Sequence, residues 1–342
     1  MVASLVRFAV RRSLNDTRHI RVVKRRHARG LVADVYRQVE RDFRMLAPPV
    51  ALHSAAPRTL AASWMVLRET LLAHGVADRA SKEAVATGVS MANSCPYCED
   101  VHSMTLDGIA DAAGRSDPDA IIGWARASAT ATVPPPFPPE PASELIGVAV
   151  AFHYYNRMVN VFLRESPFPA HVPESAKPRA RRVLGGVLRP SASGGPRPGA
   201  SLNLLPAAPL PDDLCWARPN AVVADAFARA YAATEAAGAR SVPRSVRDLV
   251  RDRLSTWEGQ APGISRSWVH EAVAELAAAD RPAGSLALAI ALASYQVDEG
   301  LVDAFRRTAP GDDTLVELAA WASMTAARRV STWLAVASPD CV

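Results

Sequence analysis

The sequence predicts an all-α protein made of two related helical units. Hydrophobic residues make up 49% of the 342 residues, whereas aromatic residues make up only 6%. That balance favours helices packed through small side chains over sheets, which need β-branched and aromatic residues. Apolar residues also recur at helical spacing in long stretches of both halves. The chain is longer than one core usually serves, so two domains are expected.

The first half contains five helix candidates in succession. Val35, Val39 and Phe43 give the first candidate its helical spacing, and the prolines at 48 and 49 are expected to end it. The proline-rich residues 133–141 cannot lie inside a helix, and a long, strongly apolar candidate follows them. The five candidates span residues 32–47, 59–75, 80–93, a stretch that begins at Cys95, and 142–163.

Residues 165–219 separate the two helical halves. They are rich in Pro, Gly, Ser and Arg, a composition typical of a linker or a wrapping arm. Helical patterning resumes near residue 220 and continues to 336. The expected division is a basic arm (1–30), a helical domain (31–164), this linker (165–219) and a second helical domain (220–342).

Charge and hydropathy exclude several classes of protein. The net charge of +5 is concentrated in the first thirty residues, and a basic end of this kind is typical of a solvated arm rather than a nucleic-acid site. No run of eighteen apolar residues is present, so no membrane span is expected. The amino terminus is not expected to be a secretory signal, because no continuous hydrophobic segment follows its first basic residue, although its Arg-rich composition is weakly similar to a transit peptide. Four cysteines form no disulfide framework, so a reducing cytoplasm is expected.

The chemistry of the chain is concentrated in the stretch SCPYCEDVH, residues 94–102. With Cys95 capping a helix, Pro96 occupies the first helical position, and Cys98 lies in the first turn, where the helix dipole favours a thiolate. His102 follows Cys98 by four residues and shares its helix face. Glu83, on the preceding helix, can face His102 if the two helices pack antiparallel. A carboxylate, an imidazole and a thiol then form a path for proton transfer.

Two alternatives arise from the residues themselves. A CxxC pair can be half of a zinc site, but no second pair of ligands follows His102, so redox chemistry is favoured and no metal or cofactor is expected. Helix geometry alone favours Cys95 as the more exposed thiolate, whereas the spacing of His102 favours Cys98. We take Cys98 as the reactive thiol. Cys215 and Cys341 lack such surroundings and are interpreted as incidental thiols.

The spacing of Glu83, Cys95, Cys98 and His102 resembles the signature of the alkyl hydroperoxide reductase D-like family, within the carboxymuconolactone decarboxylase superfamily. The likeness covers residues 35 to 163. It implies that Cys98 attacks the peroxide, that Cys95 resolves it as a disulfide, and that Glu83 and His102 relay protons. Well-known members carry a histidine immediately before the second cysteine, where this chain has Tyr97, so that branch of the relay is absent or is replaced by a phenol.

The second half repeats the helical pattern of the first without its chemistry. Residues 145–163 align without gaps on 316–334, and residues 83–102 align on 285–304. In this alignment the four signature residues correspond to Ser285, Val297, Gly300 and Ala304. The fold expected from the resemblance is therefore a tandem pair of alkyl hydroperoxide reductase D-like bundles, the second degenerate.

The resemblance implies an oxidoreductase that reduces organic hydroperoxides, with a dithiol electron donor such as a lipoylated protein. It also implies assembly into a homo-oligomer, and neither nucleic acid nor membrane is an expected partner. Two other functions remain open at this point. One is a redox-sensing or scaffolding protein whose cysteines form a disulfide without turnover. The other is a decarboxylase, which the paired cysteines disfavour because decarboxylase members of the superfamily lack them.

Overall fold

A computed structural model describes residues 17–109, 117–130, 133–168, 175, 181, 185–186 and 195–334. Over these residues the chain forms helices and no strand, which confirms the all-α fold class. None of the described helices is long and apolar enough to cross a membrane. The main helices are α2 (Gly30–Phe43), α3 (Pro48–Ala51), α4 (Pro57–Leu67), α5 (Arg79–Ala92), α6 (Pro96–Ile109), α7 (Pro118–Ala127), α8 (Ala142–Phe162), α10 (Ala221–Ser241), α11 (Arg244–Ser255), α12 (Ser267–Ala272), α13 (Arg281–Ala293), α14 (Glu299–Arg306) and α15 (Asp312–Leu334).

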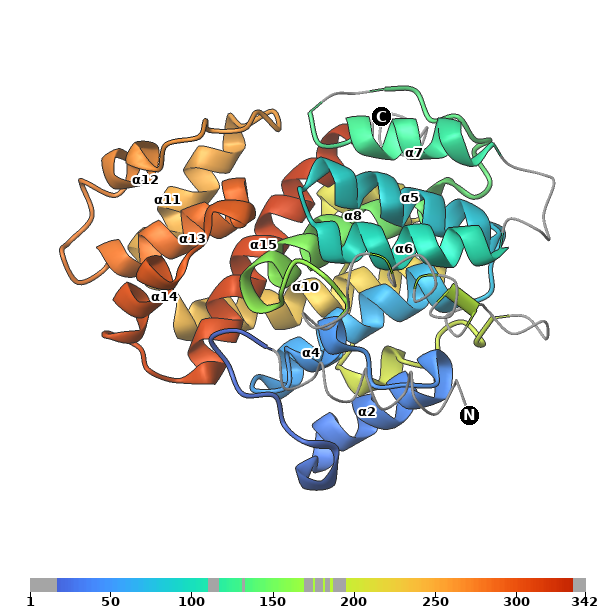
Figure 1. The fold of residues 1–342 in the computed structure, drawn as a ribbon, viewed down its shortest axis with the longest axis horizontal. Coiled ribbons are helices and arrows are strands. Elements are labelled where there is room, and N and C mark those ends of the chain that lie inside the picture. The colour runs from blue at the N-terminus through green and yellow to red at the C-terminus, as the bar shows by residue number, and fades with distance from the viewer. Residues whose placement is uncertain are drawn as a thin grey trace.

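Helix α8 is the central element of the first half. All of its residues except Ala142 and Asn160 are buried, as expected for a helix that is apolar on every face. Helix α5 packs on it and also contacts α6 and α7; α5, α6 and α7 lie together at the upper right of Figure 1. Gly88 allows the approach of α7, because a Cβ at this position would lie 2.5 Å from the Ile122 carbonyl oxygen.

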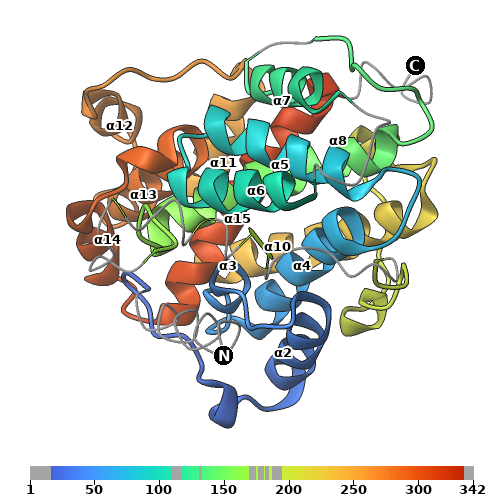
Figure 2. The same cartoon turned by 45° about the vertical axis from the view of Figure 1, so that its right-hand side comes forward.

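The second half repeats part of this arrangement. Helix α13 packs on α14 and α15 as α5 packs on α6 and α8, so the order of the aligned segments is preserved. Helices α11 to α14 gather at the opposite end of the molecule from α7, with α15 between the two groups (Figures 1 and 2). Helix α10 runs along α4 and α15, and its Gly238 faces the Trp321 ring, where a Cβ would lie 2.2 Å from that ring.

The two halves meet through α8 and α15. Polar bonds reinforce the packing: the Trp333 indole donates to the Ser128 carbonyl oxygen at 2.8 Å, and Arg157 Nε donates to the Ala291 carbonyl oxygen at 3.0 Å. The proposed domain limits at 30, 164 and 219 stay predictions.

One expected helix end is wrong. The first helix ends at Phe43 rather than near residue 47, because Arg44 adopts the left-handed conformation with φ 61°. Pro48 and Pro49 then begin α3 instead of ending the preceding helix, since a proline at the first helical position lacks only an N–H that would have no partner. In the expected linker, described residues 195–219 contain the short helices η5 (Leu202–Leu204) and η6 (Asp212–Ala217) and are otherwise irregular.

Candidate active site at the start of helix α6

The cysteine pair lies at the turn between α5 and α6. Ser94 adopts a positive φ of 49°, which reverses the chain, and α6 begins at Pro96. The Cys95 carbonyl accepts the first helical hydrogen bond from the Glu99 N–H at 3.0 Å, so Cys95 caps the helix as expected. Cys95 is fully buried and Cys98 is 3% exposed, and neither is in a disulfide.

The two thiols are close enough to share a hydrogen bond. Burial raises the pKa of the Cys98 thiol well above its ordinary value, the bond to Cys95 raises it further, and a hydrogen bond from the Asn156 side chain opposes the rise. The expectation that the helix start would lower this pKa is therefore wrong. Loss of water around a fully packed sulfur outweighs the helix dipole, so the resting Cys98 is a thiol that needs a base.

His102, a candidate base on the same helix, contacts Glu83 of α5. His102 Nδ1 lies 2.6 Å from Glu83 Oε2, so the arrangement expected from the spacing is present. Glu83 is fully buried. Its other oxygen, Oε1, accepts from Arg79 Nε at 2.8 Å, one helical turn earlier on α5. Burial alone raises the pKa of Glu83, but Arg79 and His102 outweigh it, and the net pKa is lowered.

The Glu83 carboxylate determines the tautomer and the orientation of the His102 imidazole. Because Glu83 is an acceptor, the Nδ1 of His102 carries the hydrogen, which leaves Nε2 free for a reacting proton. The ring is also held edge-on against Phe152, with centroids 4.5 Å apart. His102 and Cys98 line the same cavity without a direct hydrogen bond between them in the described structure, so a proton passing between them needs a water or the substrate.

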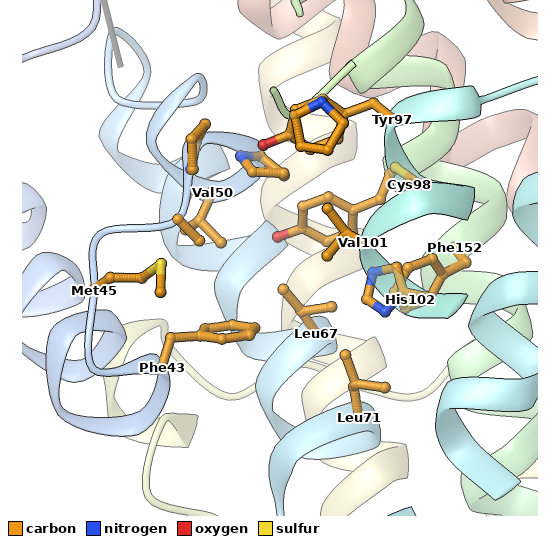
Figure 3. Close-up of a pocket in the computed structure, with 15 residues that line it drawn as sticks. Phe43, Met45, Val50, Leu67, Leu71, Tyr97, Cys98, Val101, His102 and Phe152 are labelled. Carbon is orange, nitrogen blue, oxygen red and sulfur yellow. The ribbon is translucent and has the colours of Figure 1, made fainter. Parts of the chain in front are cut away.

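The cavity in front of Cys98 is apolar. It holds about 800 Å³ of empty space, including its open mouth. In Figure 3, Phe43 and Met45 lie across the cavity from Cys98 and His102, and Leu67 and Leu71 lie below. Its lining includes no Asp, Glu, Lys or Arg. The cavity can therefore admit an uncharged organic group beside the sulfur.

A buried polar cluster lies behind the cysteine turn. His153 is fully buried, with Nδ1 3.0 Å from the Asn93 amide nitrogen and Nε2 3.0 Å from the Ser128 hydroxyl. Arg157 donates to the His153 carbonyl oxygen and to Asn93 Oδ1. These contacts give His153 and Arg157 a structural role. Asn160 also donates to the Asn93 carbonyl oxygen at 3.1 Å and to Ser294 Oγ at 3.0 Å, linking the turn to the second half.

Sequence reasoning missed Arg79 and Asn156. Arg79 precedes Glu83 by four residues, a spacing that puts both on one helix face and that could have identified it. Asn156 reaches the site from α8, and residues 43–50 form part of the cavity wall; no local pattern signals either contribution. Cys215, interpreted as an incidental thiol, is disulfide-bonded, and Cys341 lies outside the described residues. Within the described ranges, no group of three or more His, Cys, Asp or Glu side chains could hold a metal ion.

Comparison with known proteins identifies a family that matches part of the chain and a relative that covers most of it. The model of the carboxymuconolactone decarboxylase family matches residues 58–131, which include Glu83, Cys95, Cys98 and His102. An alkyl hydroperoxide reductase of Mycobacterium tuberculosis is 38% identical over 335 residues, covering 94% of this chain and 95% of the relative. No solved structure matches the chain significantly.

Proposed function

We propose that this chain, which belongs to the alkyl hydroperoxide reductase D-like family of the carboxymuconolactone decarboxylase superfamily, reduces organic hydroperoxides with a catalytic cysteine pair. One observation carries the proposal. His102, which contacts Glu83, and Cys98 line one apolar cavity, and a second thiol contacts Cys98. The mycobacterial relative, named an alkyl hydroperoxide reductase, supports the same chemistry.

The first step is deprotonation of Cys98. His102 Nε2 takes the thiol proton through a water, and the Glu83 carboxylate stabilises the imidazolium that forms. Because Arg79 keeps Glu83 ionised, Glu83 holds the charge on His102 rather than carrying the proton itself. Asn156 stabilises the resulting thiolate by its hydrogen bond.

The second step is oxidation of the sulfur. The Cys98 thiolate attacks the terminal oxygen of the hydroperoxide, the O–O bond breaks, and the alkoxide leaves with the proton held by His102. Cys98 becomes a sulfenic acid, and the substrate becomes an alcohol. Cys95, already in contact with Cys98, then attacks that sulfur and releases water, which leaves a Cys95–Cys98 disulfide.

Two electrons and two protons from a dithiol complete the cycle. Cys98 is 3% exposed and Cys95 is not exposed at all, so a reductant that works only at the protein surface cannot reach the disulfide. A small dithiol, or one carried on a flexible arm such as a lipoyl group, can enter the cavity in front of Cys98.

Peroxide consumption with a dithiol reductant tests the proposal. The unmodified chain should turn over cumene hydroperoxide, and Cys98→Ser should lose all activity. Without the dithiol, Cys95→Ser should consume one equivalent per chain and stop. A chain that forms the disulfide once and does not turn over with any dithiol would instead be a redox sensor. Activity that survives Cys98→Ser would refute the cysteine mechanism and reopen the decarboxylase alternative.

A further inference from the structure

Tyr155 carries a buried hydroxyl group that the steps above do not use. The residue is 2% exposed, and its Oη forms no hydrogen bond with any described residue. Ser63 lies close enough to the phenol to oppose the rise in its pKa, but the two hydroxyl groups do not have hydrogen-bond geometry. The adjacent Tyr154 is satisfied, since its hydroxyl lies 2.7 Å from His53 Nε2. A buried polar group without a partner is costly and calls for a functional explanation.

The position of Tyr155 points to a ligand. It lines the same cavity as Cys98 and His102, one helical turn after Phe152, against which His102 packs. The Cys98 sulfur is close enough to add to the rise that burial produces in the pKa of the Tyr155 phenol. The remaining walls are mostly apolar, so a polar group of a bound molecule is the partner that the cavity can offer this hydroxyl.

We propose that the Tyr155 hydroxyl donates a hydrogen bond to the hydroperoxide oxygen that carries the organic group. This inference rests on the proposed peroxidase function. When the Cys98 thiolate attacks the terminal oxygen, a sulfur–oxygen bond forms and the O–O bond breaks. Sulfur is oxidised to the sulfenic state, and the peroxide is reduced to an alkoxide. Negative charge develops on the oxygen that Tyr155 contacts, so the hydrogen bond strengthens in the transition state.

Tyr155 is a donor in this step and not a proton source. Its pKa is raised by burial, so the phenol stays protonated as the alkoxide forms. The alkoxide instead receives the proton that His102 took from the Cys98 thiol. The atoms therefore balance as one thiol and one hydroperoxide giving one sulfenic acid and one alcohol, with Tyr155 unchanged.

Single-turnover oxidation of Cys98 tests this role. The Cys95→Ser chain prevents disulfide formation, and cumene hydroperoxide serves as the probe, with the sulfenic acid trapped by dimedone and measured by intact mass. Adding Tyr155→Phe should slow Cys98 oxidation by about 10²-fold, the usual loss for one transition-state donor. Alkylation of Cys98 by iodoacetamide should proceed at an unchanged rate, because the departing iodide needs no hydrogen bond.

Tyr154→Phe is the matched control, since Tyr154 neighbours Tyr155 on α8 but does not line the cavity. This substitution should leave the oxidation rate unchanged and lower Tm by a few degrees, because the buried Nε2 of His53 loses its hydrogen-bond partner. Tyr155→Phe should not lower Tm, because it removes a hydroxyl that has no partner.

The outcomes separate the two proposals. If the parent Cys95→Ser chain does not react with cumene hydroperoxide, the peroxidase function fails. If the parent reacts and Tyr155→Phe reacts at the same rate, the role of Tyr155 is wrong. Equal slowing of oxidation and alkylation would mean that Tyr155 acts on the thiolate or on packing, and would also refute the proposal. Loss of rate in Tyr97→Phe but not in Tyr155→Phe would assign the donor to Tyr97, the other tyrosine of the cavity.

Discussion

Replacing Arg79 with Gln should make the reaction more sensitive to acid. Arg79 Nε and Nη2 lie 2.8 Å and 2.5 Å from Glu83 Oε1. A cation at this distance from a buried acid stabilises its carboxylate by about 1.4–4 kcal/mol, which is a tenfold to thousandfold change in the ratio of acid to carboxylate. Burial is the largest single influence on the pKa of Glu83 and raises it, so without Arg79 the pKa of Glu83 rises.

A protonated Glu83 is neutral and cannot stabilise the positive charge that His102 acquires when it takes the proton from Cys98. The kcat/KM for cumene hydroperoxide in Arg79→Gln should therefore fall about tenfold or more at pH 6, yet stay within about threefold of the parent at pH 8.5, on the scale of general acid–base catalysis. Arg79→Lys keeps the charge and should restore most of the loss at pH 6. A loss of the same size at every pH would show that Arg79 only supports the fold, and circular dichroism of each variant checks the fold independently.

Two further predictions concern Glu83 and His53. Glu83→Gln should slow turnover by about 10²-fold or more without preventing formation of the Cys95–Cys98 disulfide by a chemical oxidant; turnover at the parent rate would contradict the role of Glu83. Burial lowers the pKa of His53 to about 4, below that of an unfolded histidine, so the unfolded chain binds the proton first. The free energy of unfolding should thus be highest above about pH 6.5 and fall by roughly 3 kcal/mol on acidification to pH 4. Urea unfolding at pH 7 and pH 4.5 should show a smaller fall in His53→Gln, and equal falls in the two chains would contradict the prediction.

Local sequence patterns predicted the helices and the polar half of the site. The spacing of apolar residues placed α5 and α8 to within one residue at each end. The interval between Glu83 and His102 anticipated an antiparallel contact that brings their side chains to 2.6 Å. These features depend on helical periodicity and on a short turn. Both can be recognised within the twenty residues from Glu83 to His102.

The properties that local patterns could not give depend on distant residues. The pKa of Cys98 is raised because the packed structure removes water from the sulfur, and Pro48 and Val50 help to form the cavity wall although they precede Cys98 by about fifty residues. Asn156 reaches Cys98 from α8, across the bundle. A helix start in isolation would have had a solvated, more acidic thiol, which is the state that the sequence pattern describes.

The contact of α8 with α15 also determines how the molecule responds to dilution. Separate chains that meet through such helices dissociate once their concentration falls below the dissociation constant. The hydrogen bonds between the two chains are then lost. Here both helices belong to one polypeptide, so their effective concentration is fixed by the connection between them. Ser294 and the Ala291 carbonyl therefore stay bonded to Asn160 and Arg157 behind the cysteine turn, whether the protein is abundant or present in a few copies.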